Sequence, residues 1–134
     1  MVYAVRFLTW ILGIVHLGLF AWAATGMAEL LFSRVPWPRI SNPLFSDQML
    51  LTQWLLSLAA ALIFLLGLAL GWRNMPVALA VCYAAMAAVC AYQTFFILEN
   101  DSRFIAMAVE YAAYVAIVTF LFSTAHRQRL AGGS

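Results

Sequence analysis

The feature that most constrains this chain is a series of four long apolar runs. They lie at about residues 7–25, 49–71, 77–98 and 104–125. A bilayer core about 30 Å thick requires roughly 20 apolar residues in a helix. Of the 134 residues, 66% are apolar and 9% are charged, whereas soluble domains carry about 25% charged residues. The sequence therefore predicts an all-α integral membrane four-helix bundle, as a single transmembrane domain over residues 1–134.

Two of the connections between the runs are short and polar. One follows Gly71 and contains Pro76, which suits the start of the next helix. The other is Glu99 to Arg103. Short connections make consecutive helices antiparallel neighbours. We therefore predict up-down-up-down topology, with a polar tail at residues 126–134.

The connection at residues 26–47 is longer and rich in proline. Pro36, Pro38 and Pro43 exclude a continuous helix there. Trp37 lies between two of these prolines, and aromatic residues of membrane loops favour the headgroup level. We predict a proline-rich interfacial loop between the first and second helices.

The first apolar run also has features of a secretory signal. Ala21-Trp22-Ala23 resembles a weak cleavage site. The apolar run is longer than a usual signal core, however, so we interpret it as the first membrane helix.

Arginine placement predicts the orientation in the membrane. Loops on the cytoplasmic side carry the excess of basic residues. With alternating helices, the side that holds both termini carries four arginines, and the other side carries three arginines and four acidic residues. The first set is Arg6, Arg73, Arg127 and Arg129, and the second is Arg34, Arg39 and Arg103 with Glu29, Asp47, Glu99 and Asp101. We expect a bacterial cytoplasmic membrane with both termini cytoplasmic.

Small residues predict where helices approach one another closely. Ala80, Ala84 and Ala88 repeat every four residues and form one smooth helix face. Gly67 and Gly18 offer similar surfaces on the second and first helices. The partner of each face could be in the same chain or in another one.

Polar residues inside the apolar runs carry most of the functional information. Ionisable groups in membrane spans usually face the bundle interior and mark functional sites. Our candidates for ligand or proton binding are His16, Gln53, Ser57, Gln93, Glu110 and Tyr114. Alternating helices place His16, Gln53, Gln93 and Glu110 at similar depth, in a band about 6 Å deep at roughly 1.5 Å per residue.

The same residues have a structural interpretation. Glu110 and His16 could pair and lock the fourth helix to the first. Gln53 and Gln93 could be interhelical hydrogen-bonding groups, worth about 0.6 kcal/mol each. Both interpretations stay open at the level of sequence.

The sequence lacks the patterns of most catalytic and cofactor sites. It contains no glycine-rich phosphate loop and no Cys-x-x-Cys or nucleophile motif. His126, the second histidine, belongs to the opposite membrane face, so we expect no haem and no metal site. No run of four basic residues indicates nucleic-acid binding. The sequence thus favours a non-enzymatic role.

Three function classes remain. The first is an accessory or assembly subunit that docks against a larger membrane complex, which the small size and small-residue faces favour. The second is binding of a hydrophobic small molecule, a quinone or a lipid, in the polar layer. The third is proton- or solute-coupled transport as a homo-oligomer, with Glu110 as the titrating group and His16 as relay. The expected partners are membrane lipid and other transmembrane helices.

Overall fold

The computed structural model describes the backbone of residues 1–132 and the side chains of residues 1–124. This part of the chain is entirely helical apart from its connections. The elements are α1 (Val2–Leu31), α2 (Asp47–Leu70), α3 (Met75–Tyr92), η1 (Gln93–Ile97) and α4 (Arg103–Gly132). Four helices, with α3 and η1 counted as one, are long and apolar enough to cross a membrane. The prediction of an all-helical chain with four helices able to span a membrane is confirmed.

Helix α1 is longer than predicted. It begins at Val2 and continues through Gly26 to Leu31, so the prediction of a connection beginning at residue 26 is wrong. Gly26 remains helical because it is packed against the indole ring of Trp54 on α2. Residues 27–31 contain no proline and favour helix. The connection itself comprises residues 32–46.

The connection between α1 and α2 is tied to Glu29, a buried residue in the last turns of α1. The backbone N–H of Ile40 donates to Glu29 Oε1 at 2.7 Å, and that of Ser41 donates to Oε2 at 3.0 Å. The indole of Trp37 also donates to Oε1, at 3.1 Å. One carboxylate therefore holds the proline-rich segment against the end of α1.

The last two elements also differ from their predicted bounds. The final turn of α3 widens into the π-helix η1, in which the N–H of Leu98 donates to the carbonyl oxygen of Gln93, five residues back. The backbone of α4 remains helical to Gly132, so the helix extends beyond the end at residue 125 that the sequence predicted. No proline or glycine precedes Gly132 to end the helix. The side chains of residues 125–134 lie outside the described part.

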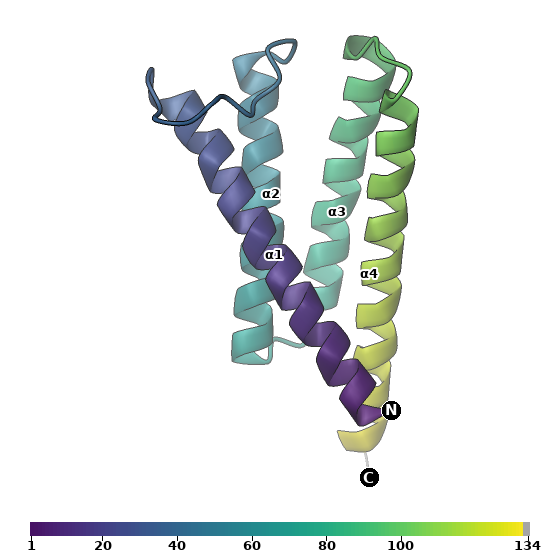
Figure 1. The fold of residues 1–134 in the computed structure, drawn as a ribbon. Helices are drawn as coiled ribbons and strands as arrows, with labels where there is room; N and C mark the ends of the chain where they lie inside the picture. Colours follow the sequence, from purple (N-terminus) through teal and green to yellow (C-terminus); the bar gives the residue numbers. More distant parts are fainter. Residues whose placement is uncertain (133–134) are drawn as a thin grey trace.

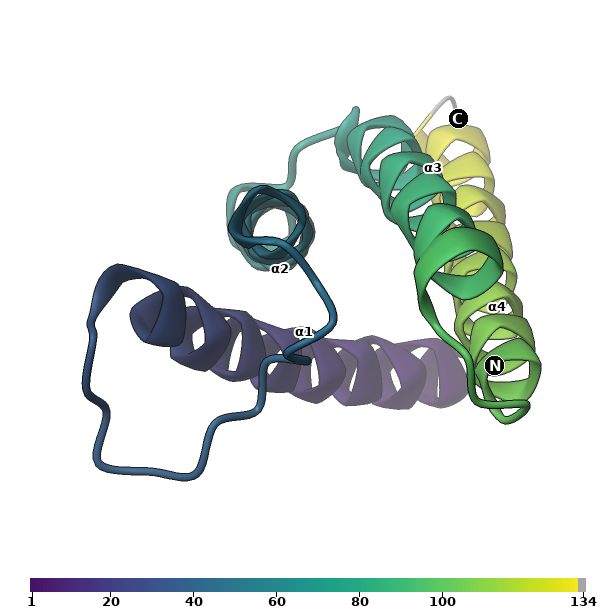
Figure 2. The ribbon, with the colours of Figure 1, turned by 90° about the horizontal axis from the view of Figure 1, so that it is seen from above.

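The helices pack against one another in chain order, α1 on α2, α2 on α3 and α3 on α4. In Figure 1, α1 runs obliquely across α2, while α3 and α4 lie alongside each other. Figure 2 shows the α1–α2 and α3–α4 pairs on two sides of the molecule. The start of α1, the end of α4 and the α2–α3 turn lie at one end of the molecule, and the other two connections lie at the opposite end (Figure 1). Phe64 and Leu79 are the largest fully buried apolar side chains, at the junction of α2 and α3.

The small residues do not all serve as predicted. Gly67 lies directly against the side chain of Met75, so this glycine does permit a close contact. A Cβ at Gly18 would meet nothing within 4 Å, and Ala84 and Ala88 are exposed. Within the described residues, the alanine face of α3 therefore points outward, and Leu79, Cys82 and Tyr83 form its buried face instead.

Candidate functional site

A cavity of about 310 Å³ lies between the four helices. All six candidate residues from the sequence line it, and every helix contributes. Its polar lining comprises His16 from α1, Gln53 and Ser57 from α2, Tyr83 and Cys90 from α3, Gln93 from η1, and Glu110 and Tyr114 from α4. The structure thus brings together residues that are up to 98 positions apart in the chain (16 to 114).

His16 is the most deeply enclosed of these groups, with no exposed surface. Its Nδ1 lies 2.7 Å from the carbonyl oxygen of Leu12, which can only accept, so Nδ1 carries a proton. Its Nε2 lies 2.5 Å from the hydroxyl of Tyr83. A neutral imidazole then accepts the Tyr83 hydroxyl proton at Nε2. Both ring nitrogens are satisfied within the protein.

Stacked aromatic rings flank the two partners of the His16–Tyr83 hydrogen bond. Phe64 stacks on His16 with ring centroids 4.0 Å apart. Tyr83 in turn stacks on Tyr114 at 4.6 Å. The polar groups are therefore fixed by a column of stacked rings that connects α1, α2, α3 and α4.

Glu110 is bonded within its own helix. The Tyr114 hydroxyl donates to Glu110 Oε1 at 2.6 Å. The direct pair between His16 and Glu110, one interpretation that the sequence left open, is absent from the described residues: His16 bonds to Tyr83, and Glu110 bonds to Tyr114. Two stacked tyrosines lie between the imidazole and the carboxylate, so the connection between α1 and α4 is aromatic and indirect.

The two glutamines do join neighbouring helices. Gln93 Nε2 donates to Gln53 Oε1 at 2.7 Å, which connects η1 to α2. Ser57 donates to the backbone carbonyl oxygen of Gln53 at 2.9 Å and therefore stays within α2. Gln93 is the first residue of the π-helix, and such widened turns are frequent at functional sites.

The polar layer is deeper than the band of about 6 Å that the sequence predicted. Because α1 continues to Leu31, His16 lies farther from the end of its helix than expected. Its partner Tyr83 lies ten positions before Gln93, which is about 15 Å along a helix. The six residues share one cavity, but they extend along the bundle axis.

Sequence reasoning missed Tyr83, Cys90 and Trp54, which also line this cavity. Tyr83 bonds to His16, and Trp54 is 2% exposed and lines the wall. Tyr83 and Tyr92 lie equally close to the middle of their apolar run, so no signal in the sequence singled out Tyr83 as the partner of the histidine. Trp54 had no signal either, because tryptophan is common at any depth of an apolar run.

The cavity offers hydrogen-bonding groups in a largely apolar wall. The Gln53–Gln93 bond leaves one amide N–H₂ and one carbonyl oxygen unpaired within the described residues. The Glu110 carboxylate accepts from Tyr114 and also lies beside the Cys90 thiol. Trp22, Met86 and Ile117 supply apolar surface. Among the described residues, no group of three or more His, Cys, Asp or Glu could hold a metal ion.

Comparisons with protein-family models, with curated proteins and with solved structures give no match to this chain.

Proposed function

We propose that the chain spans a membrane with alternating helices and both termini in the cytoplasm. The positions of the connections at the two ends of the molecule (Figure 1) and the excess of arginine at the end with the termini support this arrangement. In this arrangement the segment at residues 32–46 lies at the headgroup level, with Trp37 as an interfacial aromatic residue.

Within this bundle, we propose that the polar cavity binds a small amphipathic molecule of the quinone class. One observation carries the proposal: all four helices direct polar side chains into a single cavity that also has apolar walls. Binding sites for small molecules combine mainly apolar surface with a few convergent polar groups. A folded bundle needs no such cavity for its own stability.

The free hydrogen-bonding groups match a quinone head. The unpaired amide N–H₂ of the Gln53–Gln93 pair donates to a quinone carbonyl, and the remaining amide oxygen or Glu110 accepts from a quinol hydroxyl. A volume of about 310 Å³ holds one substituted ring, at the lower end of the roughly 300–1,000 Å³ of known ligand sites. The apolar tail of the ligand would continue between the helices into lipid.

The test uses a short-chain ubiquinone and the protein in mild detergent. Quinones quench tryptophan fluorescence, and Trp22 and Trp54 line the cavity. We expect saturable quenching in the wild type. Ala113→Phe fills the cavity, whereas Ala112→Phe is a matched control, because Ala112 is exposed and does not line it. The first variant should abolish saturable quenching and the second should retain it.

A polar pair of variants tests the head contacts. Gln53→Leu removes the free amide N–H₂ from the cavity and should weaken ubiquinone binding about tenfold, since a lost hydrogen bond in a buried site costs about 1–3 kcal/mol. Gln48→Leu is the control, because Gln48 is exposed at the start of α2. Equal quenching of wild type and Ala113→Phe, or an identical effect of both glutamine variants, would refute the proposal.

A second candidate function is an accessory subunit of a larger membrane complex. The observation that favours it is the outward alanine face of α3, with Ala84 and Ala88 exposed. Small residues let a helix of another chain approach closely in lipid. Ala84→Leu should then release a co-purifying partner, whereas Val81→Leu beside it should not. Recovery of the wild type as a monomer without a partner would exclude this role.

A further inference from the structure

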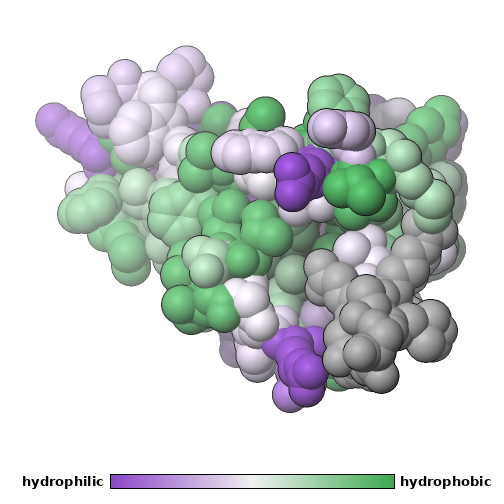
Figure 3. All heavy atoms as spheres, turned by 90° about the horizontal axis from the view of Figure 1, so that it is seen from below, coloured by the Kyte–Doolittle hydropathy of each residue, from purple (hydrophilic) through white to green (hydrophobic). Residues whose placement is uncertain are grey.

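A second cavity, of about 450 Å³, lies at the end of the molecule that holds the termini. It is formed by the start of α1, the end of α2, the start of α3 and residues 120–124 of α4. Its polar lining is Arg6, Thr9, Arg73 and Thr124, and its aromatic lining is Trp10, Phe64, Trp72 and Phe120. Figure 3 shows this end from below, with hydrophilic groups set among hydrophobic side chains.

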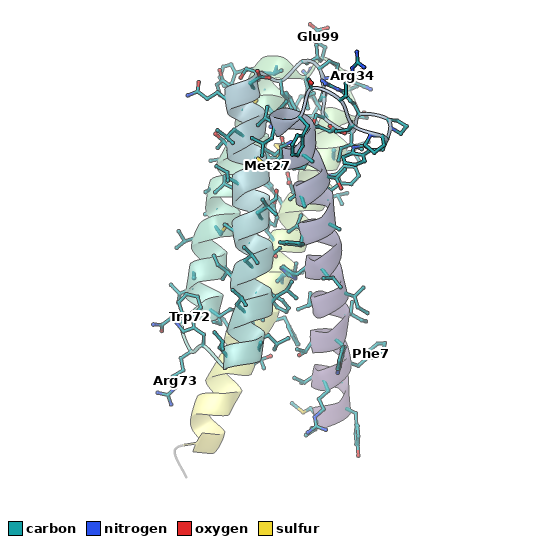
Figure 4. The ribbon with its side chains drawn as sticks, turned by 90° about the vertical axis from the view of Figure 1, so that its left-hand side faces the viewer. Phe7, Met27, Arg34, Trp72, Arg73 and Glu99 are labelled. Carbon is teal, nitrogen blue, oxygen red and sulfur yellow. The ribbon has the colours of Figure 1, made fainter. Side chains whose placement is uncertain are left out.

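Its charge is entirely basic. All five acidic residues of the chain are at positions 29, 47, 99, 101 and 110, and none of them lines this cavity. Within the described residues, the guanidinium groups of Arg6 and Arg73 make no hydrogen bond or ion pair. Figure 4 shows Arg73 and Trp72 at one side of this end and Phe7 of α1 at the other, with Arg34 and Glu99 at the far end of the molecule.

The inner wall is apolar. The buried side chains of Phe64 and Leu121 line it, together with the partly exposed Leu68. Trp10 and Trp72 are 74% and 47% exposed, as expected for residues at a membrane interface. An occupant therefore needs negative charge at the mouth and hydrocarbon inside. A free inorganic anion would satisfy the arginines but would leave the apolar wall uncovered.

We infer that this cavity binds an anionic phospholipid, with its headgroup at the mouth that Arg6 and Arg73 line and an acyl chain against the apolar wall. Basic pockets between membrane helices bind such headgroups. The two arginines come from different elements, α1 and the α2–α3 turn, so the lipid would contact both. The inference does not depend on the proposed quinone site, because the stacked Phe64 and His16 rings lie between the two cavities.

Native mass spectrometry in mild detergent tests the inference, with phosphatidylglycerol and phosphatidylcholine of identical chains as probes. We expect the wild type to prefer phosphatidylglycerol. Arg6→Gln and Arg73→Gln should each weaken its binding about fivefold, which corresponds to about 1 kcal/mol per arginine near an anionic headgroup. Arg6→Lys should retain part of the preference. Arg34→Gln, at the opposite end, should leave binding unchanged.

A pair of size variants tests the acyl-chain position. Leu68→Trp places a larger side chain in the cavity. Leu66→Trp is the control, because Leu66 is 55% exposed and does not line the cavity. The first should lower phosphatidylglycerol binding and the second should not. Equal loss with Arg34→Gln, or no loss with either arginine variant in folded protein, would overturn the inference. So would full displacement of the lipid by millimolar inorganic phosphate, which would assign the site to the free ion.

We expect substitutions in one cavity to leave ligand binding at the other cavity unchanged. Ala113→Phe in the polar cavity should leave phosphatidylglycerol binding intact, and Arg73→Gln should leave quinone quenching intact. A variant that loses both phosphatidylglycerol binding and quinone quenching, and also unfolds at a lower temperature, has lost its fold. For that position, the second variant of the same site then tests the proposal.

Discussion

The hydroxyl of Tyr83 lies 2.5 Å from Nε2 of His16 and joins the middle of α3 to α1. The imidazole is fully buried, and its other nitrogen donates to Leu12. Tyr83 thus supplies the only interhelical hydrogen bond of this histidine within the described residues. This bond, with the ring stacking around it, positions the inner end of the polar cavity.

Removing the Tyr83 hydroxyl should destabilise the bundle. Tyr83→Phe leaves the buried Nε2 of His16 without a donor and should lower the free energy of unfolding by about 1 kcal/mol, within the range for hydrogen bonds between membrane helices. The measurement is thermal unfolding in mild detergent. Tyr92→Phe is the control, because Tyr92 is 52% exposed and its hydroxyl makes no hydrogen bond in the described part. Identical unfolding temperatures for both variants would contradict this role of Tyr83.

Two glycines of α1 should respond oppositely to alanine. A Cβ at Gly26 would overlap the ring of Trp54, while one at Gly18 would meet nothing within 4 Å. Trp54 is buried and rigid, so Gly26→Ala should destabilise by about 1–3 kcal/mol through overpacking. Gly18→Ala should be neutral or stabilise by up to about 1 kcal/mol through helix propensity. Thermal unfolding compares them, and equal effects would refute the close α1–α2 contact.

Glu29 should control the order of the segment at residues 32–46. Glu29→Gln replaces one accepting oxygen with a donor that faces the N–H of Ser41, and hydrogen bonds to charged groups are worth about 1.5–3 kcal/mol. We expect faster tryptic cleavage after Arg34 and Arg39, read by mass spectrometry of the fragments. Glu99→Gln, an exposed acidic residue at the same end, should cleave at the wild-type rate. Unchanged cleavage in Glu29→Gln would show that the carboxylate does not anchor the segment.

The proposed topology predicts opposite accessibility for two connections. Asn74 lies between α2 and α3, and Asp101 lies between η1 and α4. The variants Asn74→Cys and Asp101→Cys therefore report on the two connections. In intact cells, a membrane-impermeant maleimide should label the second variant, and should label the first only after permeabilisation. The wild type is the background control, because Cys82 is buried and Cys90 is half-buried. Labelling of both variants from one side would refute alternating helices.

The sequence was informative about length and polarity. Long apolar runs separated by polar turns predicted four helices, because a chain in lipid must satisfy its backbone hydrogen bonds internally. The same logic identified His16, Gln53, Gln93 and Glu110 as residues that turn inward, because polar groups avoid hydrocarbon. Their shared cavity follows from that avoidance. The end of α1 was misjudged, because Gly26 suggested a break and its packing partner Trp54 was not apparent from the sequence.

Contacts between particular side chains required the tertiary structure. Helices that are apolar on all sides show no periodicity that reveals which face is inside, so the outward direction of Ala84 and Ala88 could not be anticipated. The pairing of His16 with Tyr83 rather than Glu110 depends on the oblique path of α1 across α2 (Figure 1). By itself, the sequence determined that this is a helical membrane protein with an inward polar set, since burial of charge and backbone polarity decide that locally. Only the packing of tilted, uniformly apolar helices decided which polar groups meet, because helix rotation and crossing angle are set by side-chain fit between distant segments.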